Sequence, residues 1–221
     1  MKTVLAIAAH PDDEALGAAG TLARHAKEGD AVHIVFLADG EGARGSTDYL
    51  SERRSAAQHA GGAMGAQSVL FHDFPDNRMD TVPLLDVAKF VEKMLLKIKP
   101  QIIYTHHGGD LNIDHQVTHR AVLTACRPMP GNQVEAIYGF EVLSSTEWAS
   151  PDQDNAFRPA HYVDITAHYT AKEKALKHYD AEMRDFPHAR SYKAAEALAT
   201  LRGAHVGFEK AEAFTVIRTV K

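Results

Sequence analysis

The chain has 221 residues, of which 45% are hydrophobic and 24% are charged, and this composition excludes a disordered chain, a fibre and a disulfide-framed miniprotein. Acidic residues outnumber basic residues by 29 to 24 and no basic stripe is present, so no nucleic-acid partner is expected. The length predicts one compact domain over residues 1–221.

The cysteine content and the apolar runs indicate the compartment. Cys126 is the single cysteine, so no internal disulfide forms, as is usual in a reducing cytosol. The apolar start of the chain is interrupted at His10, too early for a signal peptide. No apolar run reaches the about 20 residues that a membrane helix needs. We therefore expect a cytoplasmic protein without a membrane span, whose oligomeric state, a homo-oligomer included, stays open.

Short apolar runs alternate with amphipathic stretches in the first half of the chain. Continuous apolar runs predict buried strands, and apolar residues at helical spacing predict helices. In chain order we expect a strand over Thr3–Ala9, a helix over Leu16–Ala26, a strand over Val32–Ala38, a helix over Asp48–Met64, a strand over Val69–Phe74, a helix over Leu84–Ile98 and a strand over Gln101–Thr105. This alternation favours a Rossmann-like α/β fold, a mostly parallel sheet with helices on both faces in a three-layer sandwich.

The second half of the chain is less regular. We expect a strand over Val134–Leu143, a strand over Ala160–Ile165, helices over Ala167–Met183 and Ser191–Leu201, and a closing strand over Ala213–Val220. Between them, Ser144–Pro159 is a polar loop of a length that often serves function. Trp148 in this loop is a candidate for stacking on a sugar ring.

The strongest motif, His-Pro-Asp-Asp-Glu at His10–Glu14, follows the first predicted strand. Ligands of parallel sheets bind at the carboxyl ends of the strands, and imidazole with carboxylate is a natural Zn²⁺ ligand pair. His115, which opens a helix after the fourth strand, supplies a third ligand. A spare carboxylate would act as base for water, but spacing alone does not decide whether Asp12 or Asp13 is the ligand. The alternative is that these acids only cap the following helix.

Together these residues resemble the PIG-L/LmbE-like family of zinc-dependent N-deacetylases. The resemblance rests on two motifs and extends over nearly the whole chain: Ala9–Glu14, Asn112–His115, the helix that bears Arg53, the Pro75–Asn77 turn, and the tail segments Arg202-Gly203 and Ala211–Phe214. It implies an LmbE-like fold, a metal held by His10, Asp13 and His115, and Asp12 as the general base. Family members remove the acetyl group from N-acetylglucosamine moieties of larger molecules.

One position departs from the family pattern. Several relatives carry a histidine where this chain has Asn112, and an amide donates a hydrogen bond but cannot deliver a proton at neutral pH. We therefore predict that Asp12, once protonated, also acts as the acid. Asp114 is then expected to orient a ligand or Asn112 rather than to act directly.

Four residues are candidates for contact with the substrate. Arg53 matches the position where relatives hold a substrate phosphate or hydroxyl, and Asp76 is placed to bind sugar hydroxyls. Asp110 stands where some relatives have tyrosine, and His106 ends the fourth strand. The alternatives are a salt-bridged helix arginine for Arg53 and a turn-forming aspartate for Asp76.

Other patterns in the sequence are weaker evidence for a functional site. Gly40–Gly45 matches the glycine pattern of a dinucleotide-binding loop but follows the second strand and lacks the glycine inside the opening helix. We expect it to be a glycine loop at the pocket rim. His115 and His119 lie one helical turn apart and offer an alternative metal pair, incidental in a chain with 14 histidines. Cys126 is expected to be a buried apolar residue.

The sequence thus predicts a zinc-dependent enzyme that deacetylates an N-acetylated amino sugar on a glycoconjugate, nucleotide sugar or glycan, with this small molecule as its partner. Fe²⁺ or another divalent ion also suits histidine and aspartate ligands. Two alternatives stay open. One is an inactive, zinc-containing sugar-binding or regulatory module, and the other is an amidase acting on a sugar-thiol conjugate.

Overall fold

A computed structural model describes residues 1–38, 40, 50–150, 152 and 155–220. Its centre is one seven-stranded sheet with the order β3-β2-β1-β4-β5-β7-β6. The strands are β1 (Thr3–Ala8), β2 (Ala31–Ala38), β3 (Ser68–Phe74), β4 (Ile102–His106), β5 (Ala136–Phe140), β6 (His161–Asp164) and β7 (Ala211–Thr219). The first five strands pair in parallel, whereas β7 runs antiparallel to both β5 and β6.

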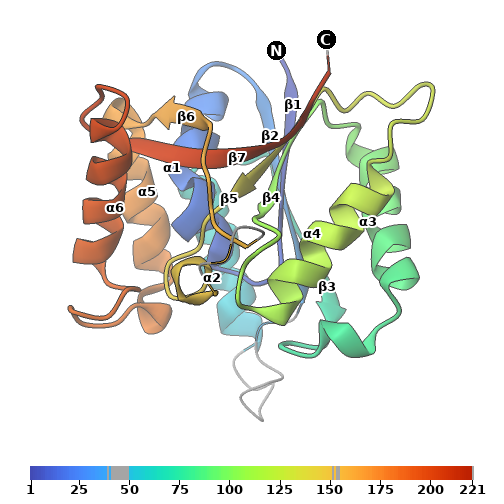
Figure 1. Cartoon of the computed structure of the whole chain (residues 1–221), viewed down its shortest axis with the longest axis horizontal. Helices are drawn as coiled ribbons and strands as arrows, with labels where there is room; N and C mark the ends of the chain where they lie inside the picture. The colour runs from blue at the N-terminus through green and yellow to red at the C-terminus, as the bar shows by residue number, and fades with distance from the viewer. Residues whose placement is uncertain (39, 41–49, 151, 153–154, 221) are drawn as a thin grey trace.

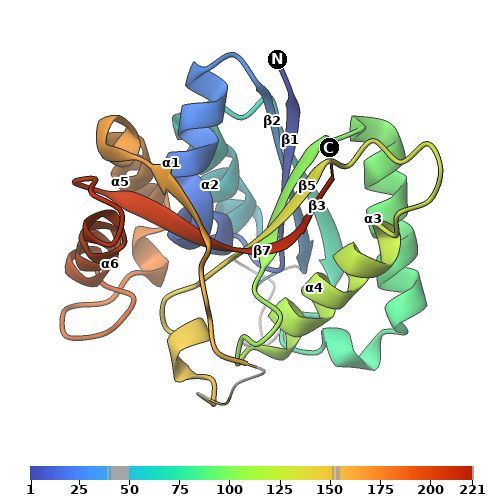
Figure 2. The same cartoon turned by 45° about the horizontal axis from the view of Figure 1, so that its top comes forward.

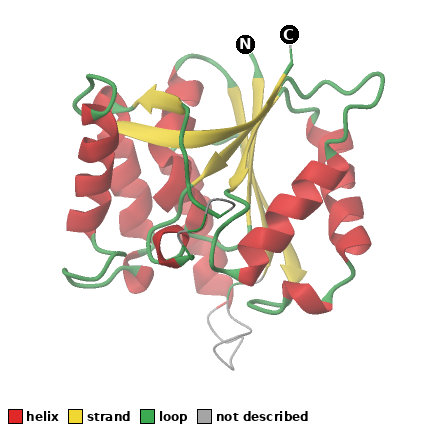
Figure 3. Cartoon of the chain, in the orientation of Figure 1, coloured by secondary structure: helices red, strands yellow, loops and turns green. Residues whose placement is uncertain are grey.

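Helices cover both faces of this sheet, so the predicted three-layer α/β fold is confirmed (Figures 1 and 3). One face carries α1 (Asp13–Lys27), α2 (Leu50–Ala63), α5 (Tyr169–His178) and α6 (Tyr192–Ala204). The other face carries α3 (Leu84–Ile98) and α4 (Ile113–Ala125). Short 3₁₀ helices span Met79–Thr81, Thr146–Trp148, Thr166–His168 and Asp180–Glu182. Among the described residues, no helix has the length and apolarity needed to cross a membrane.

The apolar core lies in two layers because the central strands are buried on both faces. Successive side chains of a strand point to opposite sides of the sheet. Val4 and Ala6 therefore pack with the layer of α1 and α2, whereas Leu5 and Ile7 pack with the layer of α3 and α4. A continuous apolar run, rather than an alternating one, is the sequence signature of such a doubly covered parallel strand.

One helix of the C-terminal part is shorter than the sequence predicts. The helix expected over Ala167–Met183 is three pieces, a 3₁₀ turn, α5 and a second 3₁₀ turn over Asp180–Glu182. Past the end of α5, Tyr179 donates a hydrogen bond to Glu14, and Glu182 accepts one from Arg53. Buried polar contacts of this kind outweigh the local preference for continuing the helix.

The Ala211–Phe214 tail motif has a structural role. Glu212 accepts hydrogen bonds from the backbone N–H groups of Gly20 (3.1 Å) and Thr21 (2.7 Å). The ammonium group of Lys172 donates to Glu212 (2.6 Å) and to the carbonyl of Leu16 (2.7 Å). This buried ion pair ties α1, α5 and β7 together.

Gly203, in the other tail motif, lets the chain pass close to α6. A Cβ atom at this position would lie 2.6 Å from the carbonyl oxygen of Phe208 and 2.9 Å from the Cα of Lys210. Overpacking of this kind costs about 1–3 kcal/mol, so we expect Gly203→Ala to lower the free energy of unfolding by that amount in urea denaturation. Gly62→Ala is the matched control, because it is a helical glycine with nothing within 4 Å of the added Cβ. Equal stability of Gly203→Ala and the wild type would contradict the close approach.

The strand direction fixes where the site lies. The amino end of β1 and the carboxyl end of β7 lie at one end of the sheet, and the carboxyl ends of the parallel strands lie at the other (Figures 1 and 2). The loops that leave this second end carry the polar motifs of the sequence.

Candidate active site

Side chains from two segments of the chain meet at the carboxyl end of the sheet. His10 and Asp13 follow β1, and His115 lies in the first turn of α4, which follows β4. One donor atom from each of these three buried residues lies within 4.8 Å of the others. The predicted ligand residues therefore do come together, as the topology of a parallel sheet requires.

Each of the two histidines faces Asp13 with one ring nitrogen and outer carboxylates with the other, a single one for His115 and two for His10, whose Nε2 also lies 3.1 Å from Oδ1 of Asp76. In His10, Nδ1 lies 3.4 Å from Oδ2 of Asp13, and Nε2 lies 3.0 Å from Oδ2 of Asp114. In His115, Nε2 lies 3.3 Å from Oδ1 of Asp13, and Nδ1 lies 3.0 Å from Oδ1 of Asp110. A histidine held between a metal and a carboxylate is the usual arrangement at metal sites. The donor set thus fits a divalent cation.

The electrostatics of the cluster also suit a cation. Burial disfavours the imidazolium form of His115, yet Asp13 and Asp110 raise its pKa to about 9. The pKa of His10 is likewise raised, by Asp114, Asp13 and Asp76, against the effect of burial. The carboxylates therefore attract positive charge, and a metal ion would replace the protons on these histidines.

Asp12 and Asp13 have different surroundings although they are neighbours in the chain. Burial raises the pKa of Asp12, which Arg190 and Arg53 partly offset. The pKa of Asp13 is held well below its usual range by His115 and His106, despite its burial. Paired carboxyl groups with opposite shifts favour different roles. Asp13 is suited to remain an anionic ligand, and Asp12 is suited to exchange a proton.

Asn112 and Asp114 link the start of α4 to the turn after β3. Asn112 is the N-cap of α4, since its Oδ1 accepts the backbone N–H of Asp114 (2.8 Å), and its Nδ2 donates to Oδ1 of Asn77 (3.1 Å). Asp114 accepts the backbone N–H groups of Asn77 (2.6 Å) and Met79 (2.9 Å) and contacts His10. Asp114 thus connects the candidate ligand His10 to the turn after β3, and its role in orienting that ligand stays a prediction.

Asp110 lies behind His115 and does not line the cavity. It accepts hydrogen bonds from the hydroxyls of Ser145 and Thr146 and from the backbone N–H of Asn112 (2.9 Å). Although burial opposes ionisation, the contact with His115 and these hydrogen bonds lower the pKa of Asp110 to about 2. The position predicted as a substrate contact is thus occupied by a buried anion that faces His115.

We expect Asp110→Asn to weaken metal binding by about 10- to 100-fold, which is the usual cost of changing an outer partner of a ligating histidine. Competition with a chromophoric chelator measures this affinity. Asp164→Asn is a matched control, because Asp164 also accepts a threonine hydroxyl (2.6 Å from Thr166) but lies in β6. Unchanged affinity in Asp110→Asn would show that the carboxylate does not support His115.

The site cavity has a volume of about 200 Å³ and a strongly polar lining. Its wall includes the three candidate ligands and nine further residues, which are Asp12, Gly40, Arg53, Asp76, Asn77, Asn112, Ser144, Ser145 and Arg190. Two of the four predicted substrate contacts, Arg53 and Asp76, are therefore in the wall. His106 is not, because it is buried behind the site, where Nε2 accepts the backbone N–H of Ala9 (2.8 Å) and the ring stacks on His115 (centroids 3.9 Å apart).

Arg53 points from α2 into the site. It donates to Glu182 (2.5 Å) and to the carbonyl of Pro11 (2.9 Å), and its guanidinium lies 3.7 Å from Oδ2 of Asp12. The salt-bridged helix arginine is therefore observed, and contact of Arg53 with a substrate phosphate or hydroxyl stays a prediction that its place in the cavity wall permits.

Sequence reasoning did not single out Arg190, Glu182, Tyr179 or Glu14 as site residues. Arg190 donates to Oδ2 of Asp12 (3.0 Å), and Tyr179 donates to Oε1 of Glu14 (2.7 Å). Ser144 and Ser145 fall at the start of the loop that the sequence indicated as functional. Arg190 and Tyr179 carry no motif that could have indicated them.

The remaining sequence candidates have different positions. Glu41–Gly45 lies outside the described residues, whereas Gly40 has a φ of +74° and lines the cavity. His119 accompanies no candidate metal group within the described part of the chain and contacts the carbonyl oxygen of His106 (2.8 Å). Cys126 is buried, as expected. Trp148 is 54% exposed and packs edge-on to His188.

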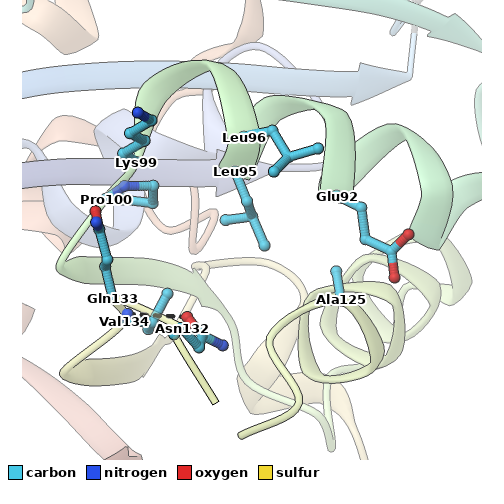
Figure 4. A pocket seen from close by; sticks show the side chains of 10 residues that line it. Glu92, Leu95, Leu96, Lys99, Pro100, Ala125, Asn132, Gln133 and Val134 are labelled. Atoms are coloured by element: carbon cyan, nitrogen blue, oxygen red, sulfur yellow. Dashed lines mark hydrogen bonds between the residues drawn. The ribbon is translucent and has the colours of Figure 1, made fainter. Parts of the chain in front are cut away.

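A larger cavity of about 410 Å³ lies at the opposite end of the sheet, between the end of α3 and the segment that leads into β5 (Figure 4). Its wall is mainly apolar and includes Leu95, Leu96, Pro100 and Val134. None of the candidate metal groups among the described residues lies there. Size alone does not mark the functional site.

The fold and the site together define an α/β protein with a candidate metal centre at the carboxyl end of a Rossmann-like sheet. The chain belongs to the PIG-L family, since residues 5–126 match the family described as PIG-L: GlcNAc-PI de-N-acetylase. The family resemblance noted in the sequence is thereby confirmed.

Three curated relatives are similar over most of the chain. The uncharacterised deacetylase YaiS of Escherichia coli K12 is 31% identical, over 80% of this chain and 89% of its own length. A 4-oxalmesaconate hydratase of Pseudomonas putida is 29% identical, over 80% and 72%. A probable N-acetyl-alpha-D-glucosaminyl L-malate deacetylase 2 of Bacillus cereus is 25% identical, over 82% and 89%.

Solved structures share the fold. The conserved protein TT1542 of Thermus thermophilus superposes with a TM-score of 0.79 at 24% identity, covering 100% of this chain and 97% of that one. An N,N'-diacetylchitobiose deacetylase of Pyrococcus horikoshii superposes with a TM-score of 0.77 at 20% identity, covering 98% and 84%. At these identities the likeness establishes the architecture.

Proposed function

We propose that the protein is a metal-dependent hydrolase that removes the acetyl group from an N-acetylated amino sugar carried by a larger molecule. The observation that carries this proposal is the position of Asp12. This buried carboxylate lines the cavity beside His10, Asp13 and His115 but is not a member of that candidate ligand group. A metal site that only stabilises the fold has no need of a further carboxylate in its cavity. Membership of a family described as a de-N-acetylase supports the choice of reaction.

His10, Asp13 and His115 would hold the metal in this proposal, and Asp114 and Asp110 would orient the two histidines. Three protein ligands leave a position open, as in catalytic rather than structural zinc sites. When bound, a divalent metal lowers the pKa of water and polarises a carbonyl oxygen. Zn²⁺ suits these ligands, and Fe²⁺ or another divalent ion is an alternative that the ligand set accepts.

Asp12 would move the proton. It accepts a proton from the attacking water and returns it to the departing amine, so that one carboxylate serves as base and then as acid. Asn112 lines the same cavity, but its amide is already shared between the N–H of Asp114 and the side chain of Asn77. Asn112 would donate a hydrogen bond to the oxyanion but would not act as the acid, because an amide cannot release a proton at neutral pH.

The size and polarity of the cavity fit a sugar. At about 200 Å³ the cavity is smaller than the clefts that hold drug-sized ligands, roughly 300–1,000 Å³. One sugar unit would enter it, and the rest of the substrate would lie outside. Arg53, Asp76 and Asn77 offer hydrogen-bonding groups for the sugar hydroxyls, and Ser144 and Ser145 line the same cavity.

Acetate release from a panel of N-acetylglucosamine compounds tests the proposal. The panel contains the free sugar, a nucleotide sugar, a lipid-linked sugar, short chitin oligomers and a sugar-thiol conjugate, each with protein loaded with zinc or Fe²⁺. Acetate release that a chelator abolishes is the expected result, and the ranking identifies the substrate class.

Two other outcomes would contradict the proposal. Binding of a panel sugar without acetate release would indicate a sugar-binding module. Hydration of 4-oxalmesaconate in a parallel assay, with no acetate released, would place the protein with its hydratase relative.

A further inference from the structure

The backbone of Asp12 adopts a conformation that aspartate rarely takes. Its φ is +121° and its ψ is −29°, in the region that favours glycine. Asp12 is also the N-cap residue of α1, yet its side chain makes no capping hydrogen bond. An L-residue keeps such a backbone only where its surroundings hold it, and strain of this kind is concentrated at functional sites. The contacts around Asp12 are therefore informative.

Glu14 and Tyr179 hold the backbone of Asp12. The N–H of Asp12 donates to Oε2 of Glu14 (3.1 Å), and the hydroxyl of Tyr179 donates to Oε1 of the same carboxylate (2.7 Å). Glu14 is fully buried and Tyr179 is 2% exposed. Both oxygens of Glu14 are thus engaged, one with the strained residue and one with the end of α5.

Arg190 holds the side chain of Asp12. Its Nη1 donates to Oδ2 of Asp12 (3.0 Å), while its Nε donates to the hydroxyl of Ser144 (3.0 Å). The carbonyl of Arg190 accepts the backbone N–H of Arg184 (2.9 Å), which closes the loop that carries it. The contact engages one carboxylate oxygen of Asp12.

We propose that the segment 179–190 positions the carboxylate of Asp12, with Tyr179 acting through Glu14 on its backbone and Arg190 acting on its side chain. This inference rests on the proposed function, in which Asp12 handles the proton. Tyr179 and Arg190 are then positioning residues supplied by a part of the chain beyond residues 5–126, which match the family. Neither residue lies in the candidate ligand group, so metal binding should not depend on them.

Tyr179→Phe tests the backbone contact, because it removes one hydroxyl and keeps the buried ring. We expect kcat to fall about tenfold, within the up to about 100-fold that a small misplacement costs, with KM and metal affinity unchanged. We also expect hydrogen exchange of the Asp12 amide, followed by NMR, to accelerate about two- to tenfold, which matches the worth of one hydrogen bond. Glu14→Met is a second variant, which removes both acceptor oxygens and should accelerate the same exchange.

Tyr192→Phe is the matched control for Tyr179→Phe. It removes a hydroxyl that donates to Asp180 (2.6 Å) in the same region, but the bond is exposed and does not lead to Asp12. Neither kcat nor exchange of the Asp12 amide should change in this variant.

Arg190→Gln tests the side-chain contact in the same way. We expect a fall in kcat of about tenfold with unchanged metal affinity, and partial recovery in Arg190→Lys, which restores one cation without the second contact to Ser144. Arg184→Gln is the control, since Arg184 is exposed and, among the described residues, its side chain bonds only to the carbonyl groups of Ala181 and Met183.

The outcomes separate this inference from the proposed function. Wild-type kcat and wild-type exchange of the Asp12 amide in Tyr179→Phe would overturn the backbone role, and wild-type kcat in Arg190→Gln would overturn the side-chain role. A wild-type protein that releases no acetate would contradict the proposed function instead. In that case the amide exchange of Asp12 still decides whether Tyr179 and Glu14 hold its backbone.

Discussion

Replacing Asp12 with asparagine should reduce acetate release by about 10²- to 10⁴-fold, the usual contribution of a general acid–base group. The variant keeps the shape of the side chain and an oxygen that can accept the hydrogen bond from Arg190. It loses the negative charge and the ability to take up a proton. Metal affinity should stay near the wild-type value, because Asp12 lies outside the group formed by His10, Asp13 and His115.

Steady-state acetate release and a chelator titration of the same preparations measure both quantities. Asp80→Asn is the control, because Asp80 is exposed in the turn after β3 and should tolerate the change. Substantial acetate release by metal-loaded Asp12→Asn would point to another base and would falsify the single-carboxylate scheme. Loss of the metal in this variant would place Asp12 among the ligands.

Replacing Asp13 with asparagine should weaken metal binding by more than the about 10- to 100-fold expected for an outer partner such as Asp110. Asp13 is the carboxylate that both candidate ligand histidines face, with Oδ2 directed to His10 and Oδ1 to His115. Its backbone starts α1, and its side chain also accepts the N–H of His10 (2.8 Å). The amide keeps these contacts in part but loses the charge that a divalent ion requires.

Isothermal titration of the metal-free protein, with metal content checked by atomic absorption, measures the loss. Asp30→Asn is the matched control, because Asp30 also pairs with a histidine, His25 (2.8 Å), at the end of α1 away from the cavity. Equal affinity of Asp13→Asn and the wild type would exclude Asp13 as a ligand. If Asp110→Asn bound the metal more weakly than Asp13→Asn, Asp110 would be the ligand and Asp13 the outer partner.

Much of the fold could be predicted because its signals are local. The apolar runs at Val4–Ala8 and Ile34–Ala38 are continuous, as strands buried on both faces require. Helical spacing from Leu84 to Ile98 gave α3 with the observed limits. Since parallel strands end at one edge, the clusters at His10 and His115 could be placed together before any coordinates were known.

The contacts of the C-terminal part could not be predicted, because they join residues that are distant in sequence. Tyr179 and Glu14 are separated by 165 positions, and Arg190 and Asp12 by 178. The bend after α5 that brings Tyr179 to the site carries no local pattern, so helical spacing suggested a longer helix. The same holds for β7, whose antiparallel place between β5 and β6 depends on pairing partners rather than on its own residues.

By itself, the sequence determined the layered α/β architecture, the motif after β1 and the family to which these residues point. The tertiary structure decided what the candidate residues touch. It placed His106 and Asp110 behind the cavity wall, distinguished the surroundings of Asp12 from those of Asp13, and brought Arg190 to Asp12. Periodicity and motif spacing report on neighbours along the chain, whereas a site is made by side chains that only the packing of the whole chain brings within hydrogen-bonding distance.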